Sequence, residues 1–186
     1  MSPTLRRCAL AAVLVPLVPV LAAAQEVSNR PAMSLSGGAR LYESTDGAST
    51  AVSAAIRSEL PIAEIFVLEL AGSAADVPDD ATSGIANLFE SQLQLAIPLG
   101  EVLTPYAGAG AGIAQVKELG AMTEDWKAIF TAAVGMRVSL SSNLGAVVDA
   151  RIRGRGSQIA SHIDMSVGVR YQFGRPDRPR FRGGRQ

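Results

Sequence analysis

Three residues that lie close together in the sequence have the types that a lipid hydrolase would use. His162 is the only histidine of the chain, and Ser161 and Asp164 lie close to it. A hydrolytic triad needs a nucleophile within reach of the histidine and an acid that orients its ring. Adjacent side chains of a strand point to opposite faces, so Ser161 is predicted to face away from His162, while Asp164 shares its face. We therefore predict a structural histidine and no catalytic residue.

A second group consists of acidic side chains in a predicted loop. The loop spans residues 73–84, is rich in aspartate, serine and proline, and contains Asp76, Asp79 and Asp80. Carboxylate oxygens are suitable ligands for Ca²⁺, but this spacing lacks the pattern of an EF-hand loop. A solvated acidic loop is the simpler interpretation, and we predict no metal site and no cofactor.

A third group is a glycine repeat at every second position, formed by Gly108, Gly110 and Gly112. Such a repeat can cradle a phosphate only where a helix follows it. Residues 117–125 have the composition of a loop instead. The glycines are therefore predicted to mark a bend or a close approach of the backbone within a strand.

The N-terminal residues have the pattern of a secretory signal peptide. Arg6 and Arg7 precede an apolar run from Ala9 to Val20, and small residues follow up to Ala24. A basic start, a short apolar run and a small-residue exit predict cleavage after Ala24, and a retained membrane anchor is the alternative. The only cysteine, Cys8, would leave with this peptide, so the mature chain is predicted to have no disulfide. The predicted organisation is a signal peptide over 1–24, one domain over 25–173 and a basic, disordered tail over 174–186.

The remaining chain alternates apolar and polar residues with a period of two, which is the pattern of half-buried strands. No further apolar run approaches the about 20 residues that a transmembrane helix needs. Eight strands of about ten residues, a length that crosses a bilayer when tilted, are predicted. Their ranges are 33–42, 52–60, 64–70, 89–97, 103–114, 126–138, 144–153 and 163–173. The second, fourth and sixth connections are predicted to be short, and the first, third, fifth and seventh to be longer.

The charged residues of these strands lie on the face opposite the apolar residues. Arginine or lysine facing lipid at mid-depth costs about 2 to 4 kcal/mol, so the charged face is predicted to line the lumen of a closed barrel. Eight strands leave room inside only for side chains or one small ligand. The predicted lumen network consists of Arg40, Arg57, Glu59, Glu69, Glu90, Lys127, Arg137, Asp149, Arg151, Arg153, Asp164 and Arg170.

Two motifs carry a family resemblance. The final strand reads S-V-G-V-R-Y-Q-F, with Gly168, Tyr171 and Phe173 in the spacing of a barrel-assembly signal, and residues 104–112 read T-P-Y-A-G-A-G-A-G. The chain resembles the small outer-membrane β-barrel proteins of the OmpA/OmpX-like and opacity-type porin-like group. Members of that group usually end at the terminal phenylalanine, whereas this chain continues to Gln186. The resemblance implies an all-β, eight-stranded antiparallel up-and-down transmembrane barrel.

The expected function follows from that fold. We expect an integral protein of the Gram-negative outer membrane, with periplasmic termini, a structural or surface-interaction role, no enzymatic activity and no wide pore. Its expected partners are outer-membrane lipid, lipopolysaccharide and the barrel-assembly machinery, and nucleic acid is not among them. The open alternatives are a small ligand-binding or lipid-modifying barrel, a narrow porin-like channel, and a soluble barrel whose apolar face points inward.

Overall fold

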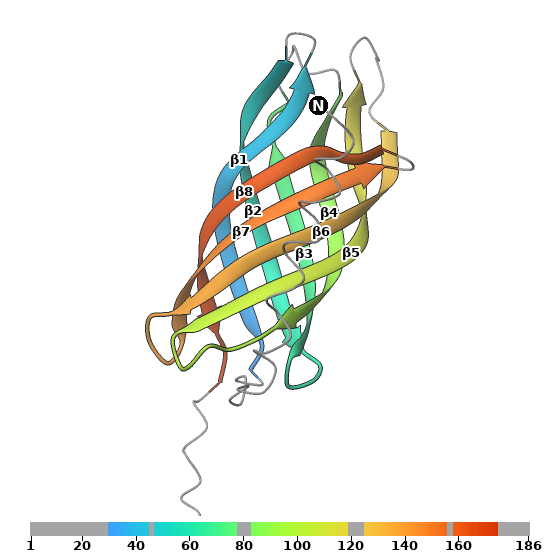
Figure 1. Cartoon of the computed structure of the whole chain (residues 1–186). Helices are drawn as coiled ribbons and strands as arrows, with labels where there is room; N and C mark the ends of the chain where they lie inside the picture. Colours follow the sequence, from blue (N-terminus) through green and yellow to red (C-terminus); the bar gives the residue numbers. More distant parts are fainter. Residues whose placement is uncertain (1–29, 45–46, 78–82, 119–124, 156–157, 175–186) are drawn as a thin grey trace, which may run out of the picture.

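The chain forms a closed antiparallel barrel in which each strand pairs with its neighbours in sequence and the first pairs with the last (Figure 1). The computed structural model describes residues 30–44, 47–77, 83–118, 125–155 and 158–174. The strands are β1 (Ala32–Ser44), β2 (Gly47–Pro61), β3 (Phe66–Ala75), β4 (Ser83–Ala96), β5 (Leu103–Glu118), β6 (Asp125–Ser139), β7 (Leu144–Arg155) and β8 (Gln158–Gln172). The predicted eight-stranded antiparallel barrel is therefore confirmed. Among the described residues, no helix is long and apolar enough to span a membrane.

Alternation along each strand separates an apolar outer face from a polar inner face. On β1, Leu35 is 67% exposed on the outside, whereas Arg40 is 0% exposed inside the barrel. On β6, Phe130 and Val134 face outward while Thr131 and Arg137 are buried inside. The period of two in the sequence is thus the period of the pleat, which turns successive side chains to opposite faces. An apolar exterior around a charged interior is the reverse of a water-soluble fold.

The connections differ from the predicted alternation of long and short loops. The pairs Ser44↔Gly47 and Arg155↔Gln158 leave two residues in the first connection and two in the seventh. β3 continues to Ala75, into residues predicted to be a loop, and β5 continues to Glu118. The prediction of longer first and seventh connections was wrong, because backbone pairing continues past the end of the apolar pattern. The third and fifth connections, over 76–82 and 119–124, remain longer than the turns 62–65 and 140–143. The described part of each terminus lies at the opposite end, beside the turns that join β2 to β3, β4 to β5 and β6 to β7 (Figure 1).

Glycines on the inner face allow neighbouring strands to approach closely. A Cβ atom at Gly110 would lie 1.9 Å from the Ser91 carbonyl oxygen, and one at Gly38 would lie 2.0 Å from the Met165 carbonyl oxygen. Small barrels coil strongly, so their strands crowd on the inner side. The glycine repeat of β5 marks such a close approach, and β6 follows it where a phosphate-binding motif would need a helix.

Replacement of Gly110 by alanine should destabilise the barrel. The added methyl group would displace the backbone of β4, and overpacking of this kind costs about 1 to 3 kcal/mol. Gly37→Ala is the matched control, because its Cβ would meet only the Ser53 carbonyl oxygen, at 3.8 Å. Urea unfolding from detergent micelles measures both variants. Equal stabilities of Gly110→Ala and Gly37→Ala would contradict the close approach at Gly110.

Arg30 binds the two ends of the chain together where the barrel closes. Its guanidinium donates to the carbonyl oxygens of Ser142 at 2.8 Å, Gln172 at 3.2 Å, Phe173 at 2.9 Å and Gly174 at 2.6 Å. The Phe173 amide in turn donates to the Pro31 carbonyl at 2.9 Å. Arg30 lies before the first predicted strand, 33–42, yet it is buried. It satisfies carbonyl groups at the end of the seam between β1 and β8.

Candidate functional site

The centre of the lumen is a network of charges built around Arg151 of β7. Its guanidinium donates to Glu69 Oε1 at 2.7 Å, to Glu90 Oε1 at 2.8 Å and to Asp149 Oδ2 at 2.9 Å. All four side chains are buried, and they come from β3, β4 and β7. A buried guanidinium holds several carboxylates well, because its five donors lie in a fixed plane. This cluster therefore connects opposite walls of the barrel.

The network continues toward the end of the barrel that lies opposite the described termini. Arg153 donates to Glu90 Oε1 at 2.9 Å and also binds Asp164. Arg40 donates to Asp164 Oδ1 at 2.6 Å and to the Ile85 carbonyl oxygen at 2.6 Å. That carbonyl lies at a register shift of β4 between Ile85 and Asn87. A bulge leaves a residue outside the ladder, and here Arg40 binds the carbonyl group that the irregularity frees.

Toward the end that holds the described termini, a second cluster forms around Glu59 of β2. Arg137 lies 3.2 Å from Glu59 Oε2, and Arg170 donates to the same oxygen at 2.9 Å. Arg137 also binds Gln94 and stacks over the Tyr106 ring, with its Cζ atom 4.2 Å from the ring centroid. Tyr106 donates to Asp149 Oδ2 at 2.9 Å. The two clusters are thereby joined through Tyr106.

The structure brings most of the predicted lumen charges into one connected group. Ten of the twelve are buried, namely Arg40, Arg57, Glu59, Glu69, Glu90, Arg137, Asp149, Arg151, Arg153 and Asp164. Arg170 is half-buried and belongs to the Glu59 cluster. Lys127 is also half-buried and lies near the start of β6. The sequence pattern placed these residues on one face, but which partners meet across the lumen depends on the three-dimensional closure.

Apolar side chains form clusters inside the barrel beside and between the charges, a feature that the sequence analysis missed. Toward the end of the barrel opposite the described termini, here called the loop end, a cluster contains Ile85, Leu88, Ala114, Val116 and Ile129. A smaller cluster there contains Tyr42, Ala51 and Val77. At the end with the described termini, Val67, Ala96, Tyr106 and Val147 pack together. Val67, Ile129 and Val147 alternate with the outward residues of their predicted strands and so share the charged face, but their packing together was not predicted. Ile85 and Leu88 share the inner face because the bulge shifts the alternation between them.

The residues considered in the sequence analysis as catalytic or metal-binding candidates do not form a catalytic site in the described part of the chain. His162 is buried, and its ring packs edge-on against Tyr42 with centroids 5.3 Å apart. Asp164, which was expected to share the histidine face, binds Arg40 and Arg153. The side chain of Ser161, together with Asp79 and Asp80, lies outside the described residues. Within the described part of the chain, no three His, Cys, Asp or Glu side chains form a group that could hold a metal ion.

The outer face carries an apolar band with polar and aromatic residues at its edges. At the loop end, Asn87 donates to Gln115 at 2.6 Å on the exposed surface. Trp126 is the register partner of Gln115, and its ring stacks with Phe89 at a centroid distance of 6.1 Å. At the other end, the rings of Tyr171 and Phe173 pack edge to face, 5.2 Å apart. Aromatic girdles at both edges of an apolar band are typical of barrels in membranes.

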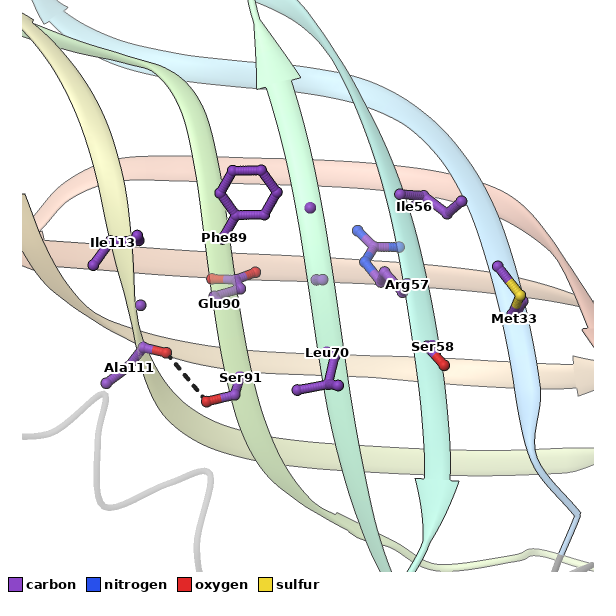
Figure 2. Close-up of a pocket in the computed structure, with 13 residues that line it drawn as sticks. Met33, Ile56, Arg57, Ser58, Leu70, Phe89, Glu90, Ser91, Ala111 and Ile113 are labelled. Atoms are coloured by element: carbon purple, nitrogen blue, oxygen red, sulfur yellow. Dashed lines mark hydrogen bonds between the residues drawn. The ribbon is translucent and has the colours of Figure 1, made fainter. Parts of the chain in front are cut away.

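A shallow groove of about 570 Å³ crosses this outer face over β1 to β5 (Figure 2). Its apolar rim is formed by Met33, Ile56, Leu70, Phe89 and Ile113. Small residues such as Gly72 and Ala111 form its floor. The groove opens outward, and Arg57 and Glu90 of the lumen network also contribute to its lining. Its apolar rim suits hydrocarbon rather than a polar substrate.

Comparisons with solved structures support the barrel fold. No family model matches the chain, and no curated protein matches its sequence. The neisserial surface protein A matches with a TM-score of 0.61 and 14% identity, covering 78% of this chain and 98% of that one. The N-terminal barrel of Pseudomonas aeruginosa OprF matches with a TM-score of 0.60 and 12% identity, covering 78% and 98%. Ail, the attachment invasion locus protein of Yersinia pestis, matches with a TM-score of 0.54 and 11% identity, covering 79% of this chain and 100% of that one. The chain is thus similar in fold to small outer-membrane barrels.

Proposed function

We propose that this protein spans the outer membrane of a Gram-negative cell as a closed barrel with a structural or surface-interaction role. The observation that carries the proposal is the inverted arrangement of an apolar outer band and a charged, buried interior. A bilayer accepts a sheet only when its first and last strands pair and leave no free edge, as β1 and β8 do. In water the same exterior would be one large apolar patch, which soluble monomers rarely expose.

The orientation follows from the connections and the ends of the chain. Barrels with an even number of strands have both termini on the periplasmic side, which would place the turns 62–65, 97–102 and 140–143 there. The predicted signal peptide over 1–24 would supply export, but it lies outside the described residues. Gly168, Tyr171 and Phe173 are proposed to be read by the barrel-assembly machinery. The partners at the outer face would be lipid and lipopolysaccharide.

The interior supports a barrier rather than a pore. The Arg151 and Glu59 clusters fill the middle of the lumen. One apolar cluster around Ile85 lies toward the end opposite the described termini, and a second packs around Tyr106, which joins the two charged clusters. An ion would have to pass buried salt bridges and then desolvate against apolar side chains, which is costly. We therefore propose that the barrel is closed to ions, in contrast to the alternative of a narrow porin-like channel.

Planar bilayer recording tests this closure. Purified protein reconstituted into planar bilayers is expected to show no steady conductance above the baseline, because side chains occupy the lumen. Heat-modifiable migration on a gel provides the control that the reconstituted protein is folded. Large and stable open-channel steps from folded protein would overturn the proposal of a closed lumen.

The same contacts support a role without catalysis. His162 is buried against Tyr42, and the nearby Asp164 is engaged by two arginines. A general base must reach a substrate proton within hydrogen-bond distance, directly or through one water, and this packing leaves His162 no open approach. Turnover of lipid A or phospholipid by the wild type that is lost in His162→Ala would contradict this part of the proposal.

A further inference from the structure

Among the described residues, the lumen network contains more positive than negative side chains. The arginines that enter it are Arg40, Arg57, Arg137, Arg151, Arg153 and Arg170, and the carboxylates are Glu59, Glu69, Glu90, Asp149 and Asp164. With every group ionised, these described side chains carry one net positive charge. A buried charge without a counter-charge is strongly unfavourable, because it has lost its water without gaining a partner. Within the described network, the cation with the fewest partners is therefore the place to look for a bound counter-ion.

Arg57 of β2 is the cation that the network satisfies least. It is only 4% exposed, and its one ion pair, from Nη2 to Asp149 Oδ1, is 3.4 Å long. Asp149 is mainly engaged by Arg151 at 2.9 Å, Tyr106 at 2.9 Å and Ser166 at 2.8 Å. Among the described residues, Nε and Nη1 of Arg57 have no hydrogen-bond acceptor at all. Three N–H donors of a buried guanidinium therefore lack partners.

Ser34 of β1 adds a further donor beside Arg57. It is the register partner of Arg57 on one side and of Arg170 on the other, and all three side chains are on the inner face. Side chains of register partners lie next to each other, with Cβ atoms about 5 Å apart. The Ser34 hydroxyl is buried and also lacks a partner in the described structure. A buried hydroxyl donor thus lies on the strand between those that carry Arg57 and Arg170.

We propose that the lumen binds one monovalent anion of halide size between Arg57 and Ser34. Nε and Nη1 of Arg57 and the Ser34 hydroxyl would donate to it, and its charge would offset the excess positive charge. Chloride is the natural occupant, because Arg57 and Ser34 are only 4% and 3% exposed and so buried a site does not admit a large organic anion. The site depends on the closed barrel and is independent of the proposed membrane role.

Bromide provides a direct probe of this site. Crystals of the detergent-solubilised wild type grown in sodium bromide should give an anomalous peak in contact with Arg57 and Ser34. In solution, chloride is exchanged for gluconate at constant ionic strength, and the folded-to-unfolded ratio is measured by urea unfolding. Above the dissociation constant, that ratio should rise about tenfold for each tenfold increase in free chloride.

Two substitutions identify the residues involved. Arg57→Gln removes the excess charge and should abolish the chloride dependence, while Ser34→Ala should shift it to higher chloride concentration. Ser36→Ala is the matched control on the same face of β1 and should behave as the wild type. A water molecule in place of bromide at Arg57, together with a wild-type stability that is equal in chloride and gluconate, would overturn the proposal.

Discussion

Arg151→Met should destabilise the barrel by about 3 to 5 kcal/mol, the usual cost of removing one partner from a buried ion pair. Methionine has a similar length but no charge, so Glu69, Glu90 and Asp149 would lose their shared cation. Glu90 keeps Arg153, and Asp149 keeps Arg57. Glu69 would keep only the hydrogen bond from Gln94 Nε2, at 2.9 Å. Its uncompensated charge is the main source of the expected loss.

Equilibrium urea unfolding in detergent micelles or lipid vesicles measures this loss, and two further variants locate its origin. Glu69→Gln added to Arg151→Met should recover part of the stability, because the uncompensated charge is then removed. Arg170→Met is the control, because Glu59 retains Arg137 as a partner, so a smaller loss is expected. A loss for Arg151→Met below about 1 kcal/mol, in the range of an exposed pair, would show that the lumen is hydrated.

Val134→Arg should cost about 2 to 4 kcal/mol of folding free energy in bilayers if Val134 lies at mid-depth of the lipid. The side chain is 52% exposed on the outer face, between Ala132 and Met136, which are also exposed. An arginine there would place a guanidinium in hydrocarbon. The expected loss should be large in vesicles and smaller in detergent micelles, where water reaches the surface more easily.

Arg137 lies three residues further along the same strand and on the opposite face, where it contacts Glu59 and Gln94. Cysteines at the two positions test the register of β6 independently of stability. In vesicles, a cysteine at position 134 should be protected from water-soluble reagents and accessible to a lipid-soluble probe. The reverse labelling pattern would show that the register is wrong by one residue, which would turn every side chain of β6 to the other face.

The architecture could be predicted from sequence because a barrel wall imposes a simple rule. Each strand has one face toward lipid and one toward the lumen, so residues such as Phe130 and Thr131 alternate strictly. The high cost of a charge in lipid then assigns Arg40 and Arg151 to the interior without knowledge of their partners. Pairing of β1 with β8 follows from the need to leave no open edge.

The parts that could not be predicted depend on three-dimensional contacts or on departures from the regular pleat. Ile85 and Leu88 are three residues apart and would face opposite sides of a regular strand, but the bulge turns both inward. Ile97 was expected on the outer face, yet it lies beyond the end of β4 and is buried. Arg30 binds backbone carbonyl groups, and these occur at every residue, so the sequence does not indicate which of them it binds. The choice of Asp149 as partner of Arg57 spans the lumen between strands that are distant in sequence.

Quenching of Trp126 fluorescence by brominated lipids tests the membrane-spanning barrel most directly. Trp126 is the only tryptophan, is 51% exposed, and lies on the outer face at the edge of the apolar band. The wild-type protein in vesicles should therefore emit at short wavelength and be quenched most strongly by bromines near the headgroup end of the acyl chains, since tryptophan prefers the membrane interface. Trp126→Phe provides the background. Emission at long wavelength with no quenching by any brominated lipid would contradict the account, because the apolar face of the barrel would then not contact lipid.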